Sequence, residues 1–371
     1  MQTPTTDSES ADSTASAGPL IVTEDTALAE HLVRICAAAG VEPQLTREGA
    51  VSRSSWESAP LVLVGDDVAE RCSGLARRPG VLLLGLDLDD GAVWVRAVRL
   101  GAEQVIFLPD CQAWLLDRIA DAAEGVGPPA LTVGVLGGRG GAGASTLACA
   151  LAVTGAREGH RTMLVDADPL GGGLDVLLGG ETSDGLRWPD LAGSRGRLSS
   201  AELAKALPEL HRLNALSWDR SDCLTIPPEA MQSVLAAARR RGGLVVVDLP
   251  RHIDPAAAEA LEQIDTCLLV VPAELRALAA TGRVAAAARM RLSDLRAVVR
   301  VPGPIGLSGA EIARNLRLPC AGELPAEPGL DLDVERGTPP GVREHGPLAR
   351  FCGSFLNEVM PPVAAAEGGA L

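Results

Sequence analysis

A run of glycines and other small residues near the middle of the chain could bind phosphate. An apolar segment, Leu131–Leu136, precedes the run, and an apolar helix is expected from about Ser145 onward. Small residues let backbone N–H groups close on phosphate oxygens, and the N-terminus of the next helix adds its partial positive charge. The spacing G-x-x-x-x-G-K-[ST] is met at Gly138, Gly143 and Ser145, but Ala144 stands where that pattern has lysine. The sequence therefore predicts a phosphate cradle that lacks its main cation.

The segment Arg139–Thr146 resembles the deviant Walker A motif, K-G-G-x-G-K-[ST]-[ST], of the MinD/ParA family. In that family the first lysine reaches across a dimer interface to the partner's nucleotide, and the second contacts the β- and γ-phosphates. Here the first position holds Arg139, which keeps the positive charge but carries it on a planar guanidinium instead of a compact ammonium group. The second position holds Ala144. Three later segments match the family's second strand with its switch, its Walker B strand, and the strand and helix that border the base. They are Met163–Gly180, Leu244–Pro250 and Cys267–Val284, so the resemblance covers roughly residues 131–360.

The resemblance implies ATP and Mg²⁺ as ligands and assigns roles to particular residues. It places the nucleotide on Gly138, Arg139, Gly140, Gly141, Ala142, Gly143, Ala144, Ser145 and Thr146. Ser145, Asp166 and Asp248 would hold Mg²⁺, partly through water, and Asp168 would position the attacking water. A lysine–phosphate contact contributes about 1.5–3 kcal/mol, so its loss weakens binding roughly 10- to 150-fold. We therefore expect weak or conditional ATP binding, with slow hydrolysis or none; a nucleotide fold kept only as a scaffold is the alternative.

Within this family, the chain most resembles the CpaE/TadZ branch and the actinobacterial septum-site-determining proteins described as CpaE-like. The features shared are the lysine-poor loop, the upstream domain and the segment Gly185–Leu191. The implied role is to position a partner, in septum-site determination or in polar localisation of a Tad/Flp pilus secretion apparatus. The implied partners are a second copy of the chain, in a homodimer, and cell-division or Tad/Flp secretion proteins. Two alternatives are a working ATPase that switches between monomer and dimer, and a ParA-like DNA-partitioning protein.

The first part of the chain alternates apolar strands with helices, which indicates a parallel sheet covered on both faces. The expected strands are Pro19–Asp25, Ala59–Asp67, Val81–Asp87 and Val105–Asp110, with helices at Thr26–Gly40 and Trp114–Ala123. This pattern resembles a response-regulator receiver domain, although Leu108 replaces the usual lysine. Asp66 is the nearest candidate phosphoacceptor, and Glu24 and Asp25 could form its acidic pocket. We favour a docking or dimerisation module over phosphoryl signalling.

The expected fold class is α/β, with a degenerate receiver-like (flavodoxin-like) domain followed by a doubly wound parallel-sheet P-loop NTPase-like domain. The expected boundaries are a disordered tail at 1–18, the first domain at 19–123, a linker at 124–130, the second domain at 131–360 and a flexible tail at 361–371. Further strands are expected at Arg161–Asp166, Leu244–Asp248, Thr266–Val271 and Leu295–Val301, and helices at Ser145–Glu158, Pro228–Arg241, Pro255–Gln263, Glu274–Arg291 and Leu348–Val359. The less regular segment Ser183–Asp219, with Trp188 and Trp218, is a candidate partner surface.

Composition narrows the possible functions. The chain has 371 residues and a net charge of −15, which argues against broad nucleic-acid binding because that needs a positive surface. A local basic face is still possible, since arginines occur at 283, 289, 291, 296 and 300; a solvated surface is the alternative. Eight cysteines without a C-x-x-C pair predict reduced thiols. We expect a cytoplasmic protein with no signal peptide and no membrane span, because the N-terminus lacks a cationic start and no apolar run approaches 18 residues. We expect no amphipathic anchor, because no Lys or Arg follows Arg350.

Overall fold

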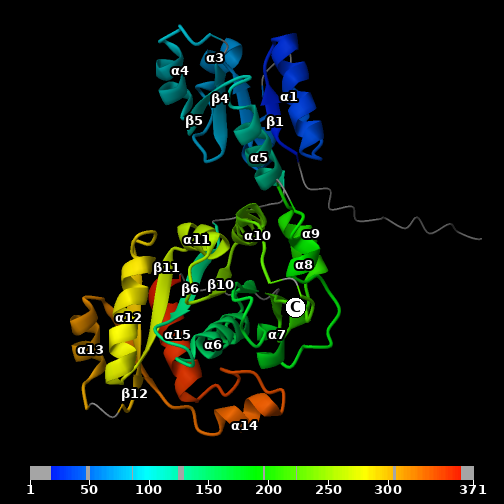
Figure 1. Ribbon diagram of the computed structural model, residues 1–371. Helices are drawn as coiled ribbons and strands as arrows, with labels where there is room; N and C mark the ends of the chain where they lie inside the picture. Colours follow the sequence, from blue (N-terminus) through cyan, green and yellow to red (C-terminus); the bar gives the residue numbers. More distant parts are fainter. Residues whose placement is uncertain are drawn as a thin grey trace, which may run out of the picture. The chain divides into compact units, whose positions relative to one another are not determined.

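The computed structural model describes residues 18–46, 51–85, 87–123, 129–194, 197–222, 224–303 and 306–360. The chain divides into two compact units, Met1–Val126 and Gly127–Leu371, and each unit has its own β-sheet (Figure 1). The expected tails lie outside the described residues except for Gly18, and so does most of the expected linker.

The first unit is a five-stranded parallel sheet with helices on both faces. Its order is β2-β1-β3-β4-β5, which is the flavodoxin-like order. The strands are β1 (Leu20–Val22), β2 (Gln44–Thr46), β3 (Val62–Gly65), β4 (Val81–Gly85) and β5 (Gln104–Phe107). The helices are α1 (Thr26–Ala38), α2 (Arg53–Ser58), the 3₁₀ turn η1 (Asp66–Val68), α3 (Ala69–Cys72), α4 (Val93–Leu100) and α5 (Gln112–Ala123). The apolar runs of β1, β3 and β4 are buried because they are covered on both sides by separate hydrophobic clusters.

The second unit is an eight-stranded sheet with the order β13-β12-β11-β6-β10-β7-β9-β8. Every neighbouring pair is parallel except β8 and β9. The strands are β6 (Leu131–Gly137), β7 (Thr162–Asp166), β8 (Glu209–Leu210), β9 (Leu213–Leu216), β10 (Leu244–Leu249), β11 (Thr266–Pro272), β12 (Leu295–Val301) and β13 (Cys320–Pro325). The helices are α6 (Ala144–Arg157), α7 (Leu174–Leu177), α8 (Trp188–Leu191), α9 (Ser200–Ala206), α10 (Pro228–Arg240), α11 (Pro255–Glu262), α12 (Leu275–Ala288), α13 (Gly309–Leu316), α14 (Leu330–Glu335) and α15 (Pro347–Val359).

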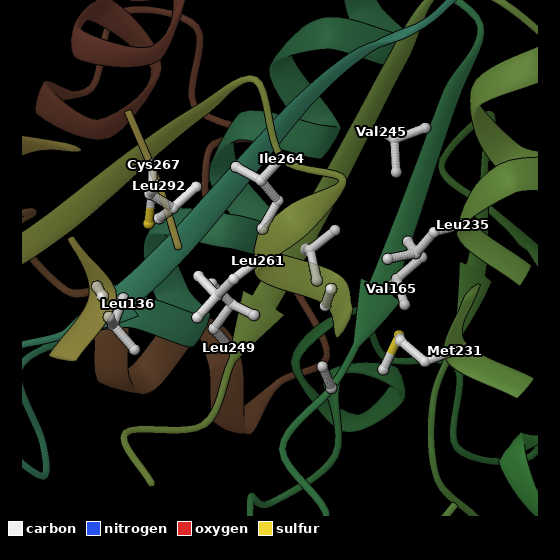
Figure 2. Packing of buried hydrophobic residues seen from close by; sticks show 14 of the residues in the cluster. Leu136, Val165, Met231, Leu235, Val245, Leu249, Leu261, Ile264, Cys267 and Leu292 are labelled. Atoms are coloured by element: carbon white, nitrogen blue, oxygen red, sulfur yellow. The ribbon is translucent and has the colours of Figure 1, made fainter. Parts of the chain in front are cut away.

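Two aliphatic clusters, one on each face, hold this sheet. On one face, side chains of the central strands meet α10 and α11, with Leu136, Val245, Leu235 and Leu261 among them (Figure 2). On the other face α6 packs against β6, β7, β10 and α15, and its residues from Leu147 to Ala156 are buried. Because α6 is apolar on every side and enclosed, the loop that precedes it is held firmly at the carboxyl end of β6.

The region after β12 contains more structure than its Pro and Gly content predicts. Besides α15, it contains α13, β13 and α14. Helix α13 begins at a capping box in which Ser308 accepts from the Glu311 N–H and Glu311 accepts from the Ser308 N–H. The capping box could have been recognised in the sequence. The prediction of only one helix in this region, Leu348–Val359, is wrong.

Candidate nucleotide site

A pocket of about 610 Å³ opens at the carboxyl edge of the second sheet. It is lined by the loop between β6 and α6, the segment after β7, the segment after β10, the end of β12, the segment from β13 to α14, and Leu348 of α15. The predicted residues Arg139, Gly140, Gly141, Ala142, Gly143, Ala144, Ser145, Thr146, Asp166, Asp168 and Asp248 all line it. Ligand sites in open α/β sheets lie at this edge, where strand order changes direction.

The loop presents its backbone to the pocket. Gly143, the N-cap of α6, has φ +94°, and Gly141 has φ +69°, conformations that residues with a Cβ rarely adopt. No side chain caps α6, so the N–H groups of its first turn are left for a ligand. Together with the helix dipole, they form a site suited to phosphate.

Gly138 has a structural role instead, and it is absent from the pocket lining. Its N–H donates to the Val270 carbonyl at 2.9 Å. A Cβ at this position would lie 2.1 Å from Oγ1 of Thr281 on α12, so glycine is required for α12 to approach the loop.

Two buried carboxylates face the loop without a cation. Ser145 donates a hydrogen bond to Asp248. Burial and the nearby Asp166 raise the pKa of Asp248, and burial raises the pKa of Asp166 to about 7. Asp166 also accepts from Ser217 Oγ at 2.9 Å, from the Leu174 N–H at 3.0 Å and from the Asp168 N–H at 3.2 Å.

This donor set fits Mg²⁺ only in part. The hydroxyl of Ser145 and the carboxylate of Asp248 are hard oxygen ligands side by side, and the raised pKa values indicate that the pair lacks a positive charge. Within the described residues, no three His, Cys, Asp or Glu side chains are grouped so as to hold a metal ion. A Mg²⁺ ion here would therefore need phosphate oxygens or water to complete its shell, as Mg²⁺ usually does.

Arg139 is held by its own chain. Its Nη2 pairs with Glu274 Oε1 at 2.8 Å, and its Nη1 donates to the Gly140 carbonyl at 3.0 Å. The guanidinium therefore lies at the rim of its own pocket, anchored next to the start of α12.

Two further arginines, Arg251 after β10 and Arg300 at the end of β12, line the same pocket. Sequence reasoning missed Arg251 and placed Arg300 in a basic surface run. The position of Arg300 near the C-terminal end of an apolar strand was the signal that could have placed it in the site, because such positions lie at the carboxyl edge of the sheet.

The rest of that basic run is mostly neutralised. Arg291 pairs with Glu262 at 2.6 Å, and Arg296 pairs with Asp294 and Glu358 at 2.9 Å each. Arg289 donates to two carbonyls at the C-terminal end of α13. The arginines do not form one basic face.

Trp188 and Trp218 are buried, so they do not provide the partner surface expected in Ser183–Asp219. Both indole N–H groups donate to the backbone carbonyl of Asp166, at 2.6 and 3.1 Å, and the rings lie 6.1 Å apart. Burying an indole N–H requires such an acceptor. The two residues therefore support β7 at the point where its carboxylate enters the pocket.

In the first unit, Asp66 is not placed as a phosphoacceptor. Both of its oxygens accept from Arg96 at 2.6 Å, and Arg96 also pairs with Asp90. The neighbouring carboxylate, Asp67, accepts from the N–H groups of Glu24 and Asp25 instead.

The expected acidic pocket is dispersed as well. Asp25 is the N-cap of α1 and accepts from Ala27 and Leu28, while Glu24 pairs with Arg71 at 2.7 Å. These carboxylates are engaged in holding the loops, which is consistent with a receiver fold that does not carry phosphoryl chemistry.

The seven cysteines of the described residues are free thiols. None of the helices in the described ranges is long and apolar enough to cross a membrane.

Comparison with known proteins gives the same two parts. The family model described as "Rv3660c-like, CheY-like N-terminal domain" matches residues 22–129. Protein Rv3660c of Mycobacterium tuberculosis is 39% identical over 319 residues, which are 84% of this chain and 90% of that protein. A putative septum site-determining protein MinD from Chlorella vulgaris is 24% identical over 213 residues, 55% of this chain and 75% of the relative. The crystal structure of a ParA family ATPase from Chlorobium tepidum has a TM-score of 0.56 at 18% identity, covering 62% of this chain and 100% of that one.

The fold, the glycine loop and these relatives define the class: a CheY-like N-terminal domain followed by a domain with the fold of the MinD/ParA-type P-loop NTPases. The predicted fold class is confirmed. Within that class, the chain belongs to the family of the mycobacterial protein Rv3660c.

Proposed function

We propose that this protein is a spatial regulator of the MinD type that binds ATP with Mg²⁺ weakly or conditionally and hydrolyses it little. The observation that carries the proposal is the pocket itself, in which the uncapped N-terminus of α6 and the Ser145–Asp248 pair meet. The loop N–H groups would bind the phosphates. Ser145, Asp248 and Asp166 would hold Mg²⁺, which would screen the phosphate charge and the two carboxylates from one another.

The presence of Ala144 in the loop supports the proposal that ATP is bound weakly and hydrolysed slowly. A lysine at the first position of α6 would reach the phosphates, and the alanine side chain provides no charge there. Asp168 follows β7 and lines the pocket, where it could orient a water molecule. Without the lysine, the charge that builds up on the transferred phosphate is less well neutralised, so turnover would be slow.

The role in positioning rests on the septum site-determining relatives. We propose homodimerisation and partners among cell-division proteins, with polar Tad/Flp secretion machinery and a CpaE/TadZ-like role as the narrower form of the proposal. The neutralised arginines around α12 and β12 give no support to the DNA-partitioning alternative.

The deciding experiment is calorimetric titration of the purified protein with ATP and with ADP in the presence of Mg²⁺, with sedimentation run in parallel. Saturable binding in the micromolar to millimolar range, a shift toward dimer with ATP and little phosphate release are expected. No binding at millimolar nucleotide would overturn the proposal and leave the fold as a scaffold. Hydrolysis as fast as that of a P-loop ATPase that keeps the lysine would overturn the limit set by Ala144.

A further inference from the structure

We propose that Arg251 and Arg300 supply the positive charge that Ala144 fails to supply, by binding the phosphate groups of the nucleotide. This inference rests on the proposed function and adds two phosphate-binding residues to the site. It begins from the position of the two arginines, which come from opposite sides of β6: Arg251 follows β10, and Arg300 ends β12 beyond β11.

Arg300 lies directly against the loop. Its Nη1 donates to the Ala142 carbonyl at 3.0 Å, and the same atom is 3.5 Å from the point that a Cβ of Gly143 would occupy. A guanidinium has five N–H donors in a planar fork, so this single bond leaves donors for an anion. Arg300 is therefore beside the N-cap of α6, where phosphate oxygens would lie.

Arg251 approaches the other end of the loop. Its Nη1 is 3.6 Å from the point that a Cβ of Gly140 would occupy, and its side chain lines the pocket. The two guanidinium groups thus flank the stretch from Gly140 to Gly143, whose N–H groups form the cradle.

The charges around these arginines favour an anionic ligand. Arg139, Arg220 and Arg296 each pair with a carboxylate. By contrast, no carboxylate of the described chain forms an ion pair with Arg251 or Arg300. In a chain of net charge −15, two cations left unpaired in a phosphate-loop pocket are suited to a phosphate ligand, which guanidinium binds through charge-assisted, often bidentate bonds.

The test is calorimetric titration of Mg-ADP, adenosine and inorganic triphosphate into the full chain and four variants. Arg300→Ala and Arg251→Ala are expected to weaken Mg-ADP and triphosphate binding about tenfold or more each, because each removes a charge-assisted contact. Adenosine binding should be unchanged. Arg283→Ala, which removes an exposed arginine on α12 outside the pocket, is the matched control and should bind like the parent chain.

The fourth variant, Arg300→Ala combined with Ala144→Lys, separates a phosphate contact from a structural role. A lysine returned to the loop should recover most of the lost affinity, whereas a collapsed pocket would not be rescued. If the arginine variants bind Mg-ADP as the parent does, or lose adenosine and nucleotide equally, this inference is overturned and the proposed function stands. If the parent chain binds neither nucleotide nor triphosphate, both are overturned.

Discussion

At the residue scale, the site combines a loop without its lysine and two buried carboxylates. Ala144 stands in place of the lysine, while Asp166 and Asp248 are 1% and 2% exposed, and the charge of Asp166 raises the pKa of Asp248. Buried carboxylates without a counter-charge destabilise a fold. A cation bound between them would therefore stabilise the folded protein.

The free energy of unfolding in the absence of metal should fall as pH rises between about 4 and about 7. The pKa of Asp166 is raised from 3.8 to about 7 in the folded state. Within this window the folded chain keeps a proton that the unfolded chain has released, so folding binds a proton, and raising the pH disfavours it. Asp248→Asn should reduce the fall, because burial and Asp166 also raise the pKa of Asp248 and the variant removes this second carboxyl group.

Urea unfolding in EDTA, at about pH 5 and about pH 8, measures this difference for the parent and for Asp248→Asn. Asp184→Asn, which changes an exposed aspartate, should keep the parent's dependence on pH. An equal dependence in the parent and in Asp248→Asn would show that Asp248 does not contribute to the fall.

At the element scale, the sequence predicted the strands and the helix of the site that consist of long apolar runs. Strands β6, β7 and β10 and helix α6 were predicted because each contains a continuous apolar run. Strand β2 was not predicted, since it has only three residues and its side chains are largely exposed. The arginines of the pocket depend on which strands become neighbours, and no local pattern encodes that.

Gly138→Ala should destabilise the second unit by about 1–3 kcal/mol, because it overpacks the contact between the loop and α12. The new Cβ would lie 2.1 Å from Thr281 Oγ1 and 3.1 Å from its Cγ2. Thr281→Ala alone loses a hydrogen bond to the Ala277 carbonyl, at a cost of about 1 kcal/mol.

The double variant should cost less than the sum of the two single changes, because Thr281→Ala makes room for the new methyl group. Urea unfolding of the four chains measures the coupling. Gly282→Ala, on the same helix with nothing within 4 Å of its Cβ position, is the control and should not lower stability. Strict additivity of the two changes would show that the contact with Thr281 does not set the requirement for glycine.

At the scale of the whole molecule, a CheY-like unit and a unit that carries the candidate nucleotide pocket are joined in one chain. The first unit has its own sheet and its own two hydrophobic clusters, and the second unit has another sheet and two clusters of its own. Removal of the first unit therefore takes no strand from the sheet of the second unit.

Deletion of residues 1–126 should abolish focal localisation of a fluorescent fusion, because we expect the receiver-like unit to provide the docking surface. The truncated chain should still bind Mg-ADP with the affinity of the full chain, since all pocket residues lie beyond the deletion. Fluorescence microscopy with an immunoblot for expression level makes the measurement. Foci that persist in the truncated chain would show that the second unit determines the localisation.

The pairing of two indoles on one backbone carbonyl also gives the protein an optical probe of its own. The chain has five tryptophans and no tyrosine, and only Trp188 and Trp218 belong to the second unit. Their shared acceptor is the Asp166 carbonyl, on the same residue whose carboxylate enters the pocket. Of the other three, Trp94 and Trp114 are exposed and open to aqueous quenchers, so the emission that survives quenching comes from buried indoles. Ligand entry that shifts β7 can thus be followed by intrinsic fluorescence in the unlabelled chain.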